Sequence, residues 1–345
     1  LVRTADLTVA VATLDRPEGL ARCLEALAAG EVLPAEVIVV DQGRGAEEVA
    51  AKIEGLSIRV LRQERRGLAA SRNLALAEAS RPVLAVTDDD CVPDAGWVRA
   101  LARWLETSPP VPLSHLPSAP RRERGDVAGA VLPGSQEEAS AAFPLSRGRE
   151  GGRWERGTGG EVHAVTGRVL PLGPDHPDLH PISSRISEVP AEFAGRALPW
   201  LVGTGGNFAA RRDILLRCGG FDERLGAGSP GGSGEDMDLL YRLLRSGARI
   251  RYEPAAVVYH ERQPRDRRLA SRSSYGRGIG ACCGLWLRGR DLHALSVLGG
   301  WLRMRGGMAA GALRRRQWGS VREELLVLGG TARGLVYGLR AGRAM

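Results

Sequence analysis

The sequence predicts an α/β fold in which helices flank a doubly wound, mostly parallel central sheet. Over the first hundred residues, short aliphatic runs alternate with amphipathic or alanine-rich stretches, and aspartates follow several of the aliphatic runs. This alternation is typical of βαβ units, whose strands are buried on both faces. Ligands of such sheets bind beyond the carboxyl ends of the strands, so a site is expected where the aspartates stand.

The N-terminal elements follow in a regular order. Strands are predicted at residues 7–12, 36–40, 58–62 and 83–86. The first helix begins at Pro17, which suits a first helical turn, and its apolar residues at 20, 23, 24 and 27 fall on one face. Further helices are predicted over residues 67–80 and 96–106. These elements form the first half of the predicted sheet.

Regular structure is interrupted after this point. Residues 107–125 are proline-rich and predict a flexible insertion, and residues 127–132 predict a strand. Residues 133–198 are loop-rich and are expected to form a variable, acceptor-facing region. Order then returns, with strands predicted at 207–209, 250–252 and 257–259, and helices at 212–218 and 233–246. We therefore predict a catalytic domain over residues 1–262 and a basic, mainly helical tail over residues 263–345.

Charge is divided unevenly along the chain. From Arg262 onwards, 17 arginines stand against four acids, so the tail carries +13 and residues 1–261 carry 8 − 13 = −5. Such a tail favours an anionic partner. Membrane surface is preferred over nucleic acid, because no nucleic-acid module is recognisable and apolar residues are mixed with the arginines. These apolar residues are Trp286, Leu287, Leu292, Leu295, Trp301 and Leu302.

The cysteines and the hydropathy pattern indicate a compartment. Five scattered cysteines without a CxxC pair suggest a reducing environment. The N-terminus is too polar for a signal peptide, and no run reaches the roughly 18 apolar residues of a membrane span. We expect a cytoplasmic protein, attached peripherally to the inner face of the plasma membrane.

The stretch LAVTDDDCVP places three aspartates after the fourth predicted strand. In an extended chain, Asp88 and Asp90 would point to the same side, with Asp89 opposite. Paired carboxylates of this kind suit a hard divalent cation that also takes phosphate oxygens. The alternative is a solvated acidic turn, and the triplet alone does not decide between the two. Asp89 has no evident role in either.

Two other strand ends carry acids. Asp15 and Asp41 are placed to accept hydrogen bonds from a base or ribose, and Arg72 to pair with phosphate. The structural alternatives are a helix cap for Asp15 and a surface turn for Asp41.

A second acidic group lies far downstream, in GEDMDL. Glu235, Asp236 and Asp238 fall at a predicted helix N-terminus, where the helix dipole favours negative charge. The functional alternative is a general base. The preceding glycine-rich stretch predicts a mobile loop that closes over a substrate. His260, after the last strand, is either structural or within reach of a metal or diphosphate.

Taken together, these motifs resemble a family 2 glycosyltransferase of the GT-A fold, over roughly residues 7–262. The resemblance lies in their joint order: TLDRP (13–17), VVDQG (39–43), GLAASRN (67–73), TDDD (87–90), GTGGNFAARRD (203–213), GGFDERLG (219–226), GEDMDL (234–239) and YEPAAVVYH (252–260).

The resemblance implies transfer of a sugar from a nucleotide-diphosphate sugar, with inversion and with Mn²⁺ or Mg²⁺. It implies Asp236 as the catalytic base beside Glu235, and metal contacts from Asp88, Asp90 and His260. The implied donor-binding residues are Thr13, Asp15, Arg16, Asp41, Arg72, Asp88, Gly205, Gly206 and Asn207. The acceptor would be a saccharide, a lipid-linked or a small molecule, in cell-envelope or glycoconjugate synthesis. Without transmembrane helices, we expect single transfer rather than polymer extrusion.

Two rival functions are considered. A sugar-phosphate nucleotidyltransferase shares the general fold but needs a glycine-rich, basic loop after the first strand, where this chain has the acidic TLDRPEG. A non-enzymatic protein that binds nucleic acid through its tail would be expected to interleave aromatic residues, and the tail does not.

Overall fold

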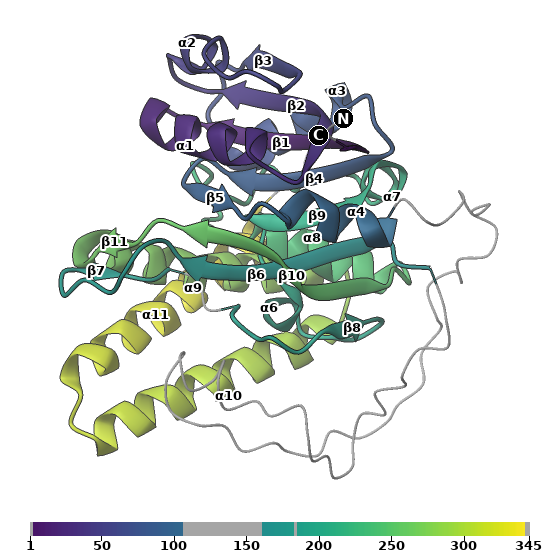
Figure 1. The fold of residues 1–345 in the computed structure, drawn as a ribbon. Coiled ribbons are helices and arrows are strands. Elements are labelled where there is room, and N and C mark those ends of the chain that lie inside the picture. Colours follow the sequence, from purple (N-terminus) through teal and green to yellow (C-terminus); the bar gives the residue numbers. More distant parts are fainter. Residues whose placement is uncertain (1–2, 106–160, 183–184, 342–345) are drawn as a thin grey trace.

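The computed structural model describes residues 3–105, 161–182 and 185–341, which form a mixed sheet flanked by helices (Figure 1). The insertion predicted at 107–125 and the strand predicted at 127–132 lie outside these residues.

The central sheet of the described residues has nine strands. The order is β3-β2-β1-β4-β9-β6-β10-β5, and β8 pairs with β10. Strands β1 to β4 are parallel to one another, β9 runs antiparallel between β4 and β6, and β6 is parallel to β10. The predicted α/β class is confirmed. The strands are β1 (Arg3–Thr13), β2 (Val32–Asp41), β3 (Ile58–Arg62), β4 (Val83–Asp88), β5 (Cys91–Pro93), β6 (Ala164–Pro171), β8 (Ala191–Phe193), β9 (Asn207–Arg211) and β10 (Ile250–His260).

Helices cover both faces of this sheet. Along β2, Val37 and Val39 face one core while Ile38 and Val40 face the other, as expected for a strand buried on both sides. The first core is completed by α1 and α4, and the second by α3, α7 and α8. The helices before the tail are α1 (Pro17–Ala28), α2 (Ala46–Ala50), α3 (Leu68–Glu78), α4 (Trp97–Leu105), α6 (Pro199–Val202), α7 (Arg212–Arg217) and α8 (Glu235–Arg245).

The second half of the sheet differs from the prediction in two places. Strand β6 lies between β9 and β10, although residues 133–198 are predicted as loop-rich. Its glycine and arginine hide it from hydropathy, but a Cβ at Gly167 would overlap the carbonyl oxygen of Ala256 on β10. The two strands predicted at 250–252 and 257–259 are one strand, β10. Its register against β6 shifts between Glu253 and Val257, around Pro254, which cannot donate a ladder hydrogen bond.

The tail forms three helices, α9 (Arg265–Arg288), α10 (His293–Arg314) and α11 (Trp318–Arg340), of which α10 and α11 extend toward the bottom of Figure 1. Helices α9 and α11 pack backbone to backbone. A Cβ on Gly334 would overlap the carbonyl oxygen of Arg277, and one on Gly280 would overlap that of Thr331. The glycines recur every four residues on each helix: Gly276, Gly280 and Gly284 on α9, and Gly330, Gly334 and Gly338 on α11.

Two tail tryptophans expected at a membrane are buried instead. Trp286 stacks on Tyr241 with ring centroids 3.7 Å apart, and Trp301 donates a hydrogen bond to Thr331. The tail therefore has a core of its own, which shares Tyr241 with α8. Among the described residues, no helix has both the length and the apolar character needed to cross a bilayer.

A small two-stranded sheet stands apart from the main one. It pairs β7 (Leu179–His180) with β11 (Gln263–Pro264), directly before α9.

Candidate active site

The three aspartates do not continue an extended strand. Strand β4 ends at Asp88, Asp89 and Asp90 form a turn, and β5 then pairs with β10. The Asp88 carboxylate accepts a hydrogen bond from Arg72 at 2.8 Å, whereas Asp89 and Asp90 both accept from Nη1 of Arg16, at 2.9 and 2.8 Å. The strand alternation on which the sequence argument rested is therefore absent, and Asp88 and Asp90 have different partners. We call residues 88–90 the aspartate turn.

Asp89, without a role in the sequence argument, anchors the turn. It is buried and accepts a hydrogen bond from Thr13 Oγ1 at 2.8 Å besides the one from Arg16. Burial raises the pKa of Asp89 to about 6, although Arg16 and Thr13 oppose the rise. Asp89 thus ties the end of β1 to the aspartate turn, and both Thr13 and Arg16 are engaged in that link.

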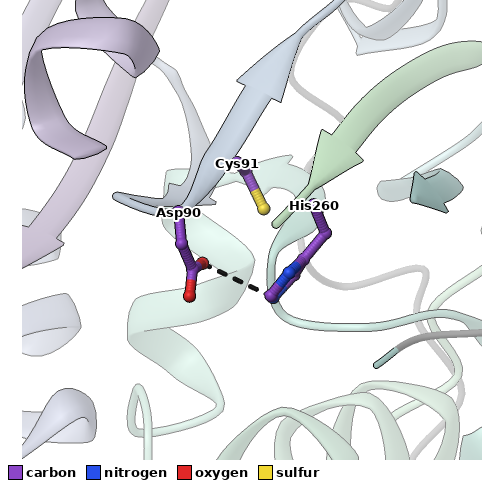
Figure 2. A group of neighbouring side chains, drawn as sticks. All are labelled: Asp90, Cys91 and His260. Atoms are coloured by element: carbon purple, nitrogen blue, oxygen red, sulfur yellow. Dashed lines mark ion pairs between the residues drawn. The ribbon is translucent and has the colours of Figure 1, made fainter. Parts of the chain in front are cut away.

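Asp90 and His260 face each other across the end of β10 (Figure 2). His260 Nε2 lies 3.4 Å from Asp90 Oδ1, and its Nδ1 is 2.8 Å from the carbonyl oxygen of Glu261. Since a carbonyl only accepts, Nδ1 carries the hydrogen. In the neutral ring, the Nε2 lone pair is then directed at a carboxylate oxygen, and two acceptors so placed suit a cation between them.

Cys91 completes this group, because one ligand atom from each of Asp90, Cys91 and His260 lies within 4.8 Å of the others. Burial raises the pKa of Cys91 well above its usual value, and Asp88 and Asp90 add to the rise. Burial therefore favours the thiol form of Cys91, and a hard divalent ion prefers oxygen and imidazole ligands to sulfur. The fitting donors are one carboxylate and one imidazole, which leaves room for phosphate oxygens and water around a hard divalent ion.

Arg72 links the two acidic motifs. It lies on α3, is only 2% exposed, and donates to Asp88 Oδ1 and Glu235 Oε1, both at 2.8 Å. Burial raises the pKa of Glu235 to about 7, with Asp236 adding to the rise and Arg72 opposing it. Arg72 was expected to pair with phosphate. Its two terminal nitrogens instead hold carboxylates from distant parts of the chain.

Asp236 and two glycines form the centre of the site. Asp236 is half-buried, and its Oδ2 accepts a hydrogen bond from the Gly205 amide at 2.8 Å. A Cβ on Gly205 would lie 2.7 Å from Arg72 Nη1, and a Cβ on Gly206 would lie 2.7 Å from Asp88 Oδ2. These glycines let the backbone pass between the two acidic motifs, where no side chain fits.

Asn207, predicted beside the donor sugar, belongs to the core. Its Nδ2 donates to the carbonyl oxygens of Arg168 and Ala256, at 2.7 and 2.8 Å, and its Oδ1 accepts from Trp97 Nε1 at 2.9 Å. Both amide hydrogens are used within the protein. Asn207 therefore joins β9, β6 and β10 behind the glycine turn.

Asp41 is buried rather than part of a surface turn. It accepts hydrogen bonds from the Gly43 amide at 2.7 Å and from Arg62 Nη1 at 3.0 Å. It therefore organises the loop that follows β2 from the inside.

Asp15 is not the cap of α1. The N-cap residue is Arg16, and Asp15 adopts a φ of +52°. Its exposed carboxylate accepts from the Arg44 amide at 3.2 Å. Asp15 and Asp41 therefore both bond to the loop at residues 43–44, one from outside and one from within.

The tail helix α9 packs against the start of α8, where Glu235 and Asp236 lie. Four α9 residues at i, i+4, i+8 and i+12 contact residues 233–238. Ser274 bonds to Ser233, a Cβ on Gly278 would overlap the Ser233 carbonyl oxygen, Cys282 donates to the Gly234 carbonyl oxygen at 3.3 Å, and Trp286 donates to Asp238 at 2.8 Å. This stripe fixes the start of α8.

Tyr275, the neighbour of Ser274 on α9, was indicated by no sequence motif. Its side chain is 39% exposed, yet desolvation raises the pKa of its phenol, and Asp236, Glu235, Asp88 and Asp90 add to the rise. Its phenol is therefore within electrostatic range of the carboxylates of both motifs. Ser274, Gly278, Cys282 and Trp286 are spaced four residues apart on α9. This spacing is the sequence feature that could have indicated one face of α9 packed against the start of α8.

Comparison with known proteins identifies relatives of this arrangement. Residues 8–121 match the model for Glycosyl transferase family 2. Pre-mycofactocin glycosyltransferase of Mycobacterium tuberculosis is 27% identical over 317 residues, which cover 89% of this chain and 54% of the relative. Chondroitin synthase of Escherichia coli is 27% identical over 267 residues, 75% of this chain and 35% of the relative. The chain thus spans about half the length of the first relative and about a third of the second.

One solved structure shares the fold over almost the whole chain. It is a mannosyltransferase from Pyrobaculum calidifontis, in complex with GDP-Man and Mn²⁺, with a TM-score of 0.51 and 16% identity. The match covers 96% of this chain and 87% of that one. The tail helices are thus included in the aligned region.

Proposed function

We propose that this chain, whose residues 8–121 match glycosyltransferase family 2 and whose fold is that of GT-A enzymes, transfers a single sugar from a nucleotide-diphosphate sugar to an acceptor hydroxyl, with inversion in one displacement. The observation that carries the proposal is the meeting of two acidic motifs across Gly205 and Gly206, with Arg72 bonded to both. One motif suits the diphosphate end of the donor, and the other suits the attacking hydroxyl.

Asp236 is the proposed general base. Its carboxylate is half-buried and fixed by the Gly205 amide, so it can accept the acceptor's proton while the acceptor oxygen attacks. Glu235 is less suited to that role, because its carboxylate is buried against Arg72. We assign Glu235 to holding Arg72, and through Arg72 the position of Asp88.

Asp90 and His260 are the residues that would hold a divalent ion, Mn²⁺ or Mg²⁺, with Asp88 at the ribose or at the same ion. When bound, the ion neutralises the charge that develops on the leaving diphosphate. The mannosyltransferase of the same fold was solved with GDP-Man and Mn²⁺, which supports this kind of donor and ion.

The loops after β1 and β2 form the proposed nucleoside side of the site. Asp15 is exposed there, while Asp41 shapes the loop from within, and Thr13 and Arg16 hold Asp89. The backbone of Gly205 and Gly206, which passes between Arg72 and Asp88, is proposed to lie beside the donor sugar. The acceptor is proposed to be a saccharide, a lipid-linked or a small molecule, and the enzyme to work in the cytoplasm, with its basic tail at the inner membrane surface.

Exchange of Asp236 for Asn tests the base. We expect D236N to lose about 10²–10⁴-fold of turnover, the usual contribution of a general base, while donor binding stays unchanged. Donor binding is measured as the Mn²⁺-dependent thermal shift with UDP-, GDP- and dTDP-sugars, and turnover with the sugar that binds.

The matched control is D213N, which changes an exposed aspartate on α7 and should leave turnover unchanged. Full activity in D236N would refute the base assignment. If none of the sugar nucleotides stabilises the unmodified protein, the donor class is wrong.

A further inference from the structure

The turn between α10 and α11 exposes apolar and basic side chains together. Trp318 is 66% exposed and Leu313 52%, and the exposed residues Arg314, Arg315 and Arg316 lie between them. Within the described part of the chain, Val189 and Leu216 are the exposed large hydrophobics outside the tail. We call residues 313–318 the hairpin tip.

The hairpin tip lies at the end of a helical hairpin whose two helices are joined by side-chain contacts. Helices α10 and α11 have 22 and 23 residues, so each is on the order of 30 Å long. A buried ion pair between Arg305 and Glu324 and the hydrogen bond from Trp301 to Thr331 join the two helices along the way. In Figure 1 the turn between them projects at lower left, away from the sheet.

We propose that the hairpin tip inserts into the headgroup region of an anionic lipid bilayer. Trp318 and Leu313 would enter the interface, where indole rings are enriched, while the three arginines meet lipid phosphates and keep their charge in water. No acid interrupts the tip, and the tail carries +13 against −5 for the rest of the chain. This charge complementarity selects an anionic surface, and the flanking apolar side chains select a bilayer.

The location differs from the one that the sequence suggested. Trp286 and Trp301 are buried, whereas Leu292, Leu295 and Leu302 remain exposed. The tip is preferred over residues 286–302 because it combines an exposed tryptophan with three adjacent arginines. The inference rests on the proposed membrane partner of the tail and not on sugar transfer. Vesicle binding needs neither donor nor acceptor, so its failure and a failure of the transfer reaction are distinguishable.

Vesicle co-sedimentation of the purified full chain tests the proposal. We expect binding to phosphatidylcholine vesicles that contain phosphatidylglycerol, and weak binding to phosphatidylcholine alone. The triple variant R314Q/R315Q/R316Q should bind the anionic vesicles on the order of 100-fold more weakly, since each basic residue at such a surface contributes about fivefold. W318S should weaken binding by about tenfold.

Matched controls separate the tip from bulk charge and from folding. The control R81Q/R99Q/R196Q removes three exposed arginines from the body, and L216S removes an exposed leucine from α7. Both should bind as the unmodified chain does, and all variants should keep its melting temperature. Equal losses in the tip and body variants, or undiminished binding in the tip variants, would overturn the proposal. A change of molecular mass with W318S in the ultracentrifuge would also overturn it, because the tip would then hold a second copy.

Discussion

The aspartate turn and the pair formed by Glu235 and Asp236 face the same small space but are held in different ways. The turn is fixed by Thr13 and Arg16 from the adjoining strand and loop. The pair depends on Arg72 from α3 and on the stripe of α9 residues behind the start of α8. The proposed metal side of the site is therefore built within the sheet, and the proposed base side is built against the tail. We infer that α9 belongs to the catalytic unit, whereas the division predicted at residue 262 sets it apart.

Replacing Arg72, which bonds to both acidic motifs, should have the largest effect. R72M leaves Asp88 and Glu235 without their shared partner, one of them fully buried, and we expect a loss of about 3–5 kcal/mol in the free energy of unfolding. Urea unfolding measures it. R65M removes an exposed ion pair just before α3 and should cost less than about 1 kcal/mol. Equal stability of the two variants would contradict the linking role.

A substitution at Gly278 should disturb the side of the site that carries Glu235 and Asp236 and leave the aspartate turn intact. In G278A the new Cβ would overlap the Ser233 carbonyl oxygen, so the loop before Glu235 must shift, at about 1–3 kcal/mol. Turnover should fall while the Mn²⁺-dependent thermal shift with donor persists, because the aspartate turn has other supports. G307A, on the open side of α10, should instead gain about 0.5–1 kcal/mol. The comparison fails if G278A loses donor binding and turnover equally.

Glu36 offers a carboxylate that serves neither side of the site. Burial alone would raise its pKa, but hydrogen bonds from Ser80, Thr8 and Arg59 outweigh it and lower the pKa to about 2. Since the unfolded chain titrates near 4.5, this stabilisation is complete above pH 4.5 and is lost as the pH falls toward 2. E36Q should cost about 2 kcal/mol at neutral pH and flatten the acid limb of stability. If the free energy of unfolding of E36Q falls below pH 4.5 as steeply as that of the unmodified chain, Glu36 is not the group responsible.

Predictability from sequence differs between the halves of the molecule. Strands β1, β2 and β4 were found because each contains an aliphatic run, and β3, which combines aliphatic residues with arginine, was predicted residue for residue. Strand β6 was missed because its glycine and arginine break the run, although close contact with β10 requires the glycine. Motif order led to the correct fold class and to a family resemblance that the match over residues 8–121 supports. It could not show that the side-chain amide of Asn207 makes all of its hydrogen bonds within the core, or that Arg72 bonds to two carboxylates.

By itself, the sequence determined the α/β sheet, the family resemblance and the residues that gather at the strand ends, because hydrophobic runs and short motifs are local. Only the tertiary structure decided how the carboxylates are shared. Arg16 bonds to a carboxylate 73 positions away in the sequence, and Arg72 to one 163 positions away. Packing of the sheet and helices brings these groups together. The same holds for the tail. Its charge is visible in the composition, but which tryptophans face solvent depends on the glycine contacts that bring α11 against α9.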